Sequence, residues 1–219
     1  MSLLSRMADH RDPASLASRL RAQRLAFFCD LLARIAGTVT ILDIGGTADF
    51  WRNPEFMGNR VKVILLNVRP EAMHDPAFES ILGDARDLSA FANDSIDVVY
   101  SNSVIEHVGP FEDQRRMANE IQRVGRRYFV QTPNVFFPIE PHFLVPGFQF
   151  MPLELRAFLL RQSRLGWVSR EPDPEVARET VASVRLLTSA QMQQLFPGSE
   201  MYRERFMGMT KSIIAYCGW

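Results

Sequence analysis

Residues 39–47 read Val-Thr-Ile-Leu-Asp-Ile-Gly-Gly-Thr, and this stretch sets the architecture that we expect. A short apolar run, rich in β-branched residues and followed by two glycines, predicts a buried parallel strand that leads into a tight turn. The same character recurs at 61–67, 96–101 and 128–131, and an amphipathic helix is predicted over 111–124. Strands that alternate with helices predict a doubly wound, mostly parallel α/β sheet of the Rossmann-like kind.

The C-terminal part of the chain departs from this alternation. A helix is predicted over 189–195, and two strand-like runs follow closely at 201–206 and 210–216. Only Met207-Gly208-Met209 separate these runs, which is too short a connection for a parallel crossover. We therefore expect an antiparallel hairpin at the end of the otherwise parallel sheet.

Two further segments complete a single expected domain over 1–219. Apolar residues at helical spacing in 15–35 make 1–37 an expected N-terminal helical extension. Residues 135–187 hold several prolines and phenylalanines, and we expect them to fold over the sheet edge as a lid on the active site. The aromatic residues of this insertion are too numerous for a solvated linker. A structural core and a homodimer surface are the alternatives to a substrate pocket.

Composition excludes several functional classes. The chain has 219 residues, is 47% apolar, and carries 25 basic and 25 acidic residues. A zero net charge argues against a general nucleic-acid binder, which needs a basic excess to neutralise phosphates. No run approaches the roughly 18–20 apolar residues of a membrane span, and the first ten residues do not resemble a signal peptide. With only two cysteines, Cys29 and Cys217, a cytoplasmic protein without a disulfide framework is expected.

Small and polar residues stand at the carboxyl ends of the predicted strands. In a doubly wound sheet, ligands bind beyond these ends, where the strand order reverses. Glycines in the first turn let the backbone approach a ligand closely, and free N–H groups there can bind a polar group. The residues are Asp43, Gly45, Gly46 and Thr47 after the first strand, Asn67 after the second, Asp84 and Ala85 after a strand predicted at 78–82, and Ser101 and Asn102 after the fourth.

Four motifs arrive in a distinctive order, namely Ile41-Leu42-Asp43-Ile44-Gly45-Gly46, Gly83-Asp84-Ala85, Asp94 to Asn102, and Val104-Ile105-Glu106-His107-Val108. Together they resemble the class I S-adenosylmethionine-dependent methyltransferases, and the Glu-His pair is similar to that of their small-molecule branch. The resemblance covers 38–134 by motif and 188–219 by topology. It implies a seven-stranded sheet with an antiparallel seventh strand, which agrees with the predicted hairpin.

The resemblance implies S-adenosylmethionine as the cofactor and assigns its methionine part to the first turn. The Gly45-Gly46 turn would lie under the methionine, and Asp43 would reach its amino group directly or through water. Ser101-Asn102 would offer carbonyls to the same ammonium. Thr47 stands where the family usually has its second glycine, although its N–H is still available. The alternative role for Asp43 is to cap the next turn.

The same resemblance assigns the ribose of the cofactor to the end of the second strand and the adenine to the end of the third. Asn67 occupies the place of an acid that usually accepts both ribose hydroxyls, and an amide there adds no charge assistance. Asp84 would accept from the adenine amine, with the Ala85 backbone at the ring edge. The alternative role for Asp84 is to cap the loop toward Arg86.

Glu106 and His107 are the candidate catalytic residues. Methyl transfer from a sulfonium needs a close, aligned acceptor, and it needs a base only if the acceptor must lose a proton. His107 has the intrinsic pKa of a general base. The alternative is that the pair merely fixes the loop after the fourth strand.

Glu140 and His142 are the candidate substrate-binding residues, because flanking prolines would present them stiffly. A proline-rich packing loop is the alternative for this segment. No set of His, Cys, Asp and Glu residues has metal-ligand spacing, so no metal is expected.

Three arginines of the first helix, Arg19, Arg21 and Arg24, are interpreted as a solvated face. The alternative is that one of them contacts the carboxylate of the cofactor.

The sequence therefore predicts a methyltransferase that transfers a methyl group from S-adenosylmethionine to an oxygen or nitrogen of a small, partly apolar organic acceptor. One rival is a cofactor-binding sensor or assembly protein of the same fold without transfer activity. Another is a methyltransferase of macromolecules, which the zero net charge disfavours.

Overall fold

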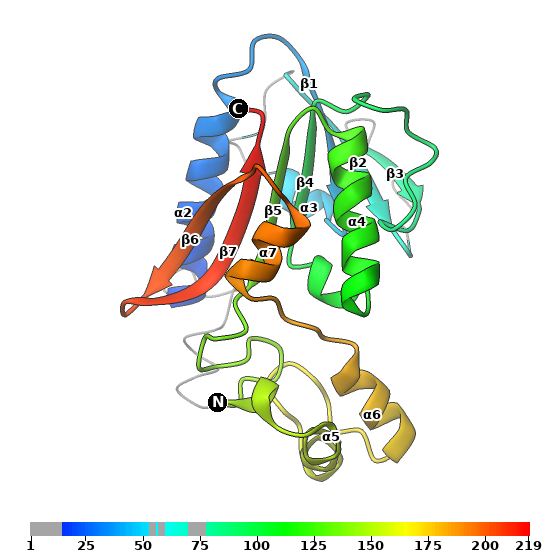
Figure 1. Ribbon diagram of the computed structural model, residues 1–219, viewed down its shortest axis with the longest axis vertical. Coiled ribbons are helices and arrows are strands. Elements are labelled where there is room, and N and C mark those ends of the chain that lie inside the picture. The colour runs from blue at the N-terminus through cyan, green and yellow to red at the C-terminus, as the bar shows by residue number, and fades with distance from the viewer. Residues whose placement is uncertain (1–14, 53–55, 57–59, 70–77) are drawn as a thin grey trace.

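The computed structural model describes residues 15–52, 56, 60–69 and 78–219 (Figure 1). The first fourteen residues of the expected N-terminal extension lie outside the described residues. Across the described ranges, every helix is too short or too polar to cross a membrane.

Within the described residues, seven strands form one sheet in the order β3-β2-β1-β4-β5-β7-β6 (Figure 1). The pairs among β1 to β5 are parallel, whereas β7 runs antiparallel to both β5 and β6. The predicted doubly wound sheet is confirmed. The strands are β1 (Val39–Ile44), β2 (Val61–Asn67), β3 (Phe78–Leu82), β4 (Val98–Asn102), β5 (Tyr128–Pro133), β6 (Glu200–Phe206) and β7 (Met209–Cys217).

The predicted C-terminal hairpin is confirmed, with a loop one residue shorter than expected. Phe206 pairs with Met209, so only Met207 and Gly208 form the loop. Their φ angles of 49° and 80° are both positive. Two positive values are typical of a type I′ turn, whose twist matches that of the flanking strands.

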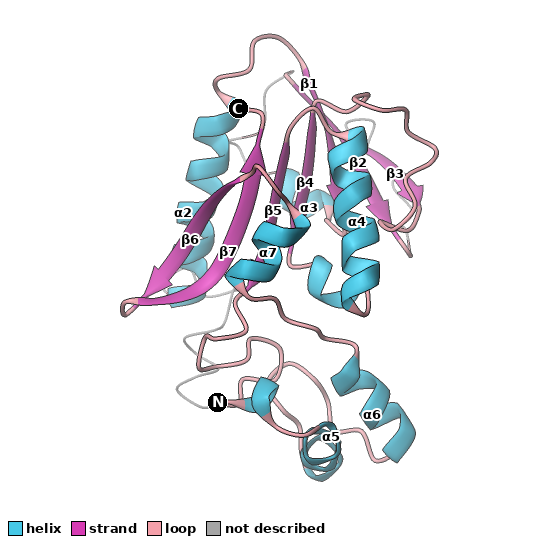
Figure 2. Ribbon diagram, viewed as in Figure 1, coloured by secondary structure: helices cyan, strands magenta, loops and turns pink. Residues whose placement is uncertain are grey.

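Helices cover both faces of the sheet (Figure 2). Along β1, Ile41 packs on the face with α2 and α3, and Leu42 packs on the face with α4 and α7. This alternation follows from the two-residue period of a strand, and both side chains are fully buried. The helices are α2 (Leu16–Leu32), α3 (Ala48–Trp51), α4 (Phe111–Val124) and α7 (Ser189–Leu195), and a short 3-10 turn, η1 (Ile105–His107), follows β4.

The insertion at 135–187 lies beyond the carboxyl ends of the parallel strands (Figure 1). It contains a 3-10 turn, η2 (Phe148–Phe150), and two helices, α5 (Leu153–Gln162) and α6 (Pro174–Ala182). Its helices pack on a small core of their own, formed by Phe143, Phe148, Ala157, Leu160, Ala177 and Val181. Helix α6 was not predicted, although its start carries a helix signal, an Asp173 N-cap followed by Pro174 at the first helical position.

Candidate functional site

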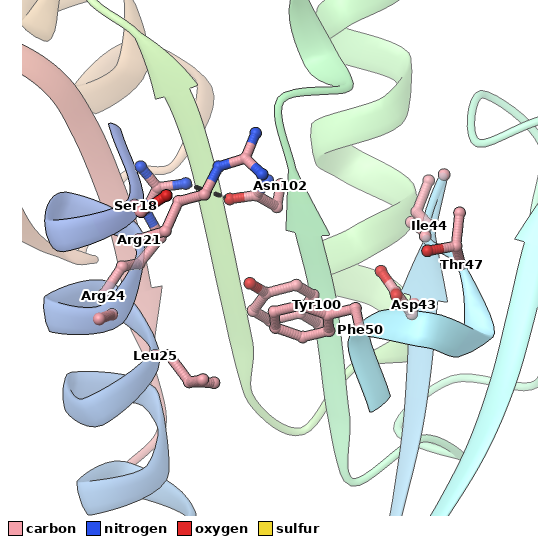
Figure 3. Close-up of a pocket in the computed structure, with 13 residues that line it drawn as sticks. Ser18, Arg21, Arg24, Leu25, Asp43, Ile44, Thr47, Phe50, Tyr100 and Asn102 are labelled. Carbon is pink, nitrogen blue, oxygen red and sulfur yellow. Dashed lines mark hydrogen bonds between the residues drawn. The ribbon is translucent and has the colours of Figure 1, made fainter. Parts of the chain in front are cut away.

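A cavity of about 470 Å³ opens at the carboxyl end of β1, where the strand order reverses. It lies between α2, the turn after β1, and the end of β4 (Figure 3). This is the place where doubly wound sheets bind ligands. The lining residues are Ser18, Arg21, Ala22, Arg24, Leu25, Asp43, Ile44, Gly45, Gly46, Thr47, Phe50, Tyr100 and Asn102.

The Gly45-Gly46 turn has no room for side chains. Gly45 has a φ of +75°, and a Cβ there would lie 2.5 Å from a methyl group of Val104. A Cβ on Gly46 would lie 1.6 Å from the Oδ2 atom of Asp43. Both glycines are therefore required by the close packing of the turn against its neighbours. Thr47, the next residue, is the N-cap residue of α3, and its side chain makes no capping hydrogen bond.

Asp43 is a buried carboxylate at the end of β1. Its Oδ2 atom accepts a hydrogen bond of 2.6 Å from the indole nitrogen of Trp51. Burial raises the pKa of Asp43 to about 7, and the Trp51 hydrogen bond opposes this shift only in part. A cationic group in the cavity would stabilise the ionised carboxylate, so the site favours a ligand with an ammonium group.

A second cavity, of about 210 Å³, lies on the other side of the turn and shares Ile44 and Gly45 with the first. Asn67, Asp84, Ala85 and His107 are among its lining residues. The side-chain nitrogen of Asn67 donates a hydrogen bond of 3.0 Å to the Gly46 carbonyl. This bond uses one N–H of the amide, so the amide oxygen and the second N–H remain for a ligand.

Asp84 is held by an adjacent arginine. The Arg86 guanidinium lies 2.6 Å from its Oδ2 atom, and the Arg86 backbone N–H donates to Oδ1 at 2.9 Å. These contacts lower the pKa of Asp84. The same guanidinium reaches Asp113 at 2.9 Å. Asp84 thus closes the loop and also lines the second cavity, so its two expected roles are compatible.

Ser101 and Asn102 end β4 with different exposure. Ser101 is fully buried, and its hydroxyl has no hydrogen-bond partner among the described residues. The amide oxygen of Asn102 accepts a hydrogen bond from Arg24 and lies in the first cavity (Figure 3).

Arg24 corrects the expectation of a solvated helix face. It is buried, and its guanidinium forms a bidentate pair with Glu204 at 2.7 and 2.6 Å. It also donates to Gln131 at 3.0 Å. The sequence could not reveal this, because the partner lies on β6, far along the chain.

Arg21, one helical turn earlier, lines the first cavity and points toward Asn102 (Figure 3). Within the part of the chain that the structure describes, no acidic side chain pairs with it. The surrounding protein and the nearby Arg24 lower the pKa of Arg21. The cavity therefore presents a cation on one side and the Asp43 carboxyl on another.

Glu106, His107, Glu140 and His142 come together from two distant segments. Glu106 and His107 belong to η1, whereas Glu140 and His142 belong to the insertion. The His107 and His142 rings pack edge to face with centroids 4.8 Å apart. The Nδ1 atom of His142 lies 2.6 Å from Glu140 Oε1. All four are candidate site residues of the sequence, and the structure brings them into one cluster.

Burial governs the protonation of this cluster. It raises the pKa of Glu106 to about 7. The surrounding protein, followed by His142, lowers the pKa of His107 to about 4, although part of the His107 ring is exposed. Burial lowers the pKa of His142, but the hydrogen bond and charge of Glu140 and the charge of Glu106 outweigh it, so the net shift is upward.

Comparison with known proteins identifies the fold. Residues 26–128 match the family described as a methyltransferase domain. A solved methyltransferase from Aquifex aeolicus, described as S-adenosylmethionine-dependent, has a TM-score of 0.50 and 12% identity, and the match covers 99% of this chain and 98% of that one. Phosphoethanolamine N-methyltransferase 2 of Haemonchus contortus, solved with S-adenosyl-L-methionine, has a TM-score of 0.50 and 15% identity over 83% of this chain and 38% of that one.

Other matches carry no functional description that transfers. A Rhodobacter sphaeroides protein, provisionally named a Zn-dependent alcohol dehydrogenase, has a TM-score of 0.59 and 14% identity over 86% of this chain and 87% of that one. At such identity the likeness shows the fold alone. Two curated proteins of Mycobacterium tuberculosis, both described as uncharacterized, are 36% identical over 52 residues, which are 24% of this chain and 18% of each relative. The match therefore spans less than a fifth of the length of these relatives.

Proposed function

We propose that this chain, which carries a class I S-adenosylmethionine-dependent methyltransferase domain, binds S-adenosylmethionine across the ends of β1 and β4 and transfers its methyl group to an oxygen or nitrogen of a small, partly apolar organic acceptor. One observation carries the proposal. A cavity holding Asp43, the glycine turn and Asn102 lies at the switch point of a sheet whose last pair is antiparallel. A nicotinamide-binding Rossmann enzyme instead uses a G-x-G-x-x-G turn that opens a helix.

The charges of the first cavity suit the amino-acid part of the cofactor. The methionine moiety carries an ammonium and a carboxylate. In this proposal the ammonium faces Asp43 and the carbonyls of Ser101-Asn102, and the carboxylate faces Arg21. Gly45, Gly46 and the N–H of Thr47 supply the close backbone contact.

The second cavity takes the nucleoside part of the cofactor. Asn67 is fixed by its hydrogen bond to the Gly46 carbonyl and accepts a ribose hydroxyl through its amide oxygen. Asp84 accepts from the adenine amine, and the Ala85 backbone lines the ring edge. Since Gly45 and Ile44 border both cavities, the reactive sulfonium lies near the Gly45 turn.

The acceptor is assigned to the side of His107, which borders the second cavity. During transfer, a lone pair of the acceptor attacks the methyl carbon, the C–S bond breaks, and its electron pair stays on sulfur as a neutral thioether. The acceptor then loses a proton. His107 and Glu106 are the proposed catalytic residues, and His142 and Glu140 the proposed acceptor-binding residues. A pKa near 4 makes His107 a weak general base, so it needs another way to assist.

One observation favours the alternative of cofactor binding without transfer. Asn67 donates a hydrogen bond to the Gly46 carbonyl, and as an amide it offers the ribose no carboxylate. A sensor needs a bound cofactor but no acceptor. The two functions separate in one assay, because only the enzyme releases S-adenosylhomocysteine when small hydroxyl and amine acceptors are added.

Calorimetry tests the cofactor assignment. We expect S-adenosylmethionine to bind the full chain with micromolar-scale affinity. Asp84→Ala removes a carboxylate acceptor and should weaken binding by about 1–3 kcal/mol, or roughly ten- to hundredfold. Asp49→Ala is the matched control, since Asp49 is an exposed acid in the helix after the first turn, where it pairs with Arg52. Binding of nicotinamide dinucleotides in place of S-adenosylmethionine would overturn the proposal.

A further inference from the structure

Three side chains of the Glu106 cluster present ligand atoms to one another. One ligand atom each from Glu106, His107 and His142 lies within 4.8 Å of the other two. Zinc binds nitrogen and oxygen at about 2.0–2.2 Å, so these atoms need to close by less than about an ångström around a cation. Side-chain rotation of the partly exposed His107 can supply that movement.

One carboxylate oxygen of Glu106 has no hydrogen-bond donor in the described part of the chain. The side chain is fully buried, and Oε2 accepts a hydrogen bond of 3.0 Å from the hydroxyl of Thr132. Oε1 is buried as well, and no donor from the described segments reaches it. A buried, ionisable oxygen without a partner is expensive, so its presence in a well-packed fold points to a ligand.

Glu140 orients His142 for coordination. Its Oε2 atom accepts backbone hydrogen bonds from His142 and Phe143 at 2.8 and 2.7 Å, which fixes the carboxylate. Its Oε1 atom engages the Nδ1 atom of His142 at 2.6 Å, so the Nε2 atom is the one left for a ligand. Metal-binding histidines commonly donate their second ring nitrogen to a carboxylate in this manner.

We propose that Glu106, His107 and His142 form a binding site for a divalent transition-metal cation, with Glu140 as the positioning residue for His142. Two imidazole nitrogens and one carboxylate oxygen suit zinc or ferrous iron, and three protein ligands leave a position open for a further ligand. The site is built by two segments. The return of the insertion ties η1 in place, since the Arg185 N–H donates to the Glu106 carbonyl at 2.8 Å.

The role of this cation in transfer rests on the proposed function. His107 lines the second cavity together with Gly45, so a cation held by His107 would lie beside the expected location of the acceptor. A divalent cation there acts as a Lewis acid on a hydroxyl acceptor, whose proton passes to bulk water before the new O–C bond forms. The metal site therefore narrows the proposed acceptors, from molecules with an oxygen or nitrogen nucleophile to molecules with a hydroxyl group.

The test is a calorimetric titration of the chelator-treated full chain with Zn²⁺. We expect one Zn²⁺ per chain, and association weakened about 100-fold or more by Glu106→Gln, His107→Ala or His142→Ala. Glu140→Gln should retain one ion per chain with affinity lowered about 10- to 100-fold. The matched control is His10→Ala with His74→Ala, which removes the other two histidines of the chain. This control should bind Zn²⁺ as the wild type does.

Two further measurements test the metal site even if a substitution of a buried residue causes misfolding. His107 is partly exposed, so its substitution should leave the fold intact, and retained Zn²⁺ affinity in that variant overturns the site. Titration with Co²⁺ reports the ligand field directly. Its visible bands should change shape in Glu140→Gln, whereas unchanged bands would show that Glu140 does not position a ligand.

A third measurement separates this site from the proposed function. S-Adenosylmethionine binding to the metal-free protein tests the cofactor assignment alone. If the cofactor binds and Zn²⁺ does not, the metal site is wrong and the proposed function stands. If Zn²⁺ binds and the cofactor does not, the metal site stands without its role in transfer.

Discussion

Two buried charged groups of this protein differ in how completely they are satisfied. Glu204 receives both arms of the Arg24 guanidinium and the hydroxyl of Ser212. Glu106 receives one hydroxyl, and its second oxygen has no donor within the described ranges. Both carboxylates lie in the interior. The first arrangement is complete without any ligand, whereas the second is complete only with one.

The contrast shows how to separate structural charges from functional ones. A buried charge with a full set of partners joins elements of the fold, here α2 to the C-terminal hairpin. A buried charge with a missing partner is retained at the expense of stability, which indicates a functional reason. Asp43, like Glu106, has one side-chain donor, the Trp51 indole, but it also lines the first cavity, where a ligand can reach it.

The largest expected effect on the free energy of unfolding is at the Arg24–Glu204 pair, whose hydrogen bonds are complete. Glu204→Gln removes the charge opposite Arg24 but keeps the shape of the side chain. The guanidinium is then a buried cation without its counter-ion, which should lower the free energy of unfolding by about 3–5 kcal/mol. Urea denaturation measures this.

The control for that prediction is an exposed ion pair. Glu112→Gln breaks the Arg115–Glu112 pair on the surface of α4, where both side chains are 55% exposed. Its expected effect is below about 1 kcal/mol. If the two substitutions lower the free energy of unfolding equally, the Arg24–Glu204 pair stabilises the fold no more than a surface ion pair does.

A second large effect on the free energy of unfolding is expected at Asp43, and it depends on pH. The pKa of Asp43 is raised from 3.8 to about 7. An acid with a raised pKa in the folded state lowers stability as pH rises from about 4 to about 7, because the unfolded chain releases its proton first. At about 1.4 kcal/mol per pH unit over about three units, the accumulated loss is about 4 kcal/mol.

Asp43→Asn isolates this dependence. The stability of the variant relative to wild type should increase between pH 4 and pH 7 and then level off, as followed by urea denaturation at each pH. Asp49→Asn, an exposed acid, is the control. A constant difference across this range would show that Asp43 titrates as an ordinary acid.

Local patterns predicted most of the fold. The apolar run at 39–44 and its two glycines identified β1 and the turn at the switch point, and a short connection identified the antiparallel hairpin. These features depend on neighbouring residues, which the sequence presents together. They also placed Asp43, Asn67 and Asp84 at the same edge of the sheet, because carboxyl ends of parallel strands meet there.

Contacts between distant segments were not predictable in the same way. Arg24 has the spacing of an exposed helix residue, and only its position opposite β6 makes it buried. His142 reaches His107 because the insertion returns under η1, and no spacing between two single histidines records that path. Both failures come from side chains whose partners are set by the tertiary fold rather than by the local chain.

The smallest expected effect is at Glu106, and it changes sign with the ligand. Glu106→Gln keeps an oxygen for the Thr132 hydroxyl and removes a buried charge whose Oε1 atom has no donor among the described residues, so without metal the free energy of unfolding should rise by about 1 kcal/mol. Zn²⁺ at 100 times its dissociation constant should stabilise the wild type by about 2.7 kcal/mol. The variant should gain much less, because it has lost a ligand.

Urea denaturation of wild type and Glu106→Gln, with and without Zn²⁺, measures both values. The effect of Glu204→Gln should be the same under either condition, because no ligand completes that pair. If Zn²⁺ stabilises wild type and Glu106→Gln equally, the missing partner of Glu106 is not a metal ion, and the contrast between the two carboxylates loses its functional meaning.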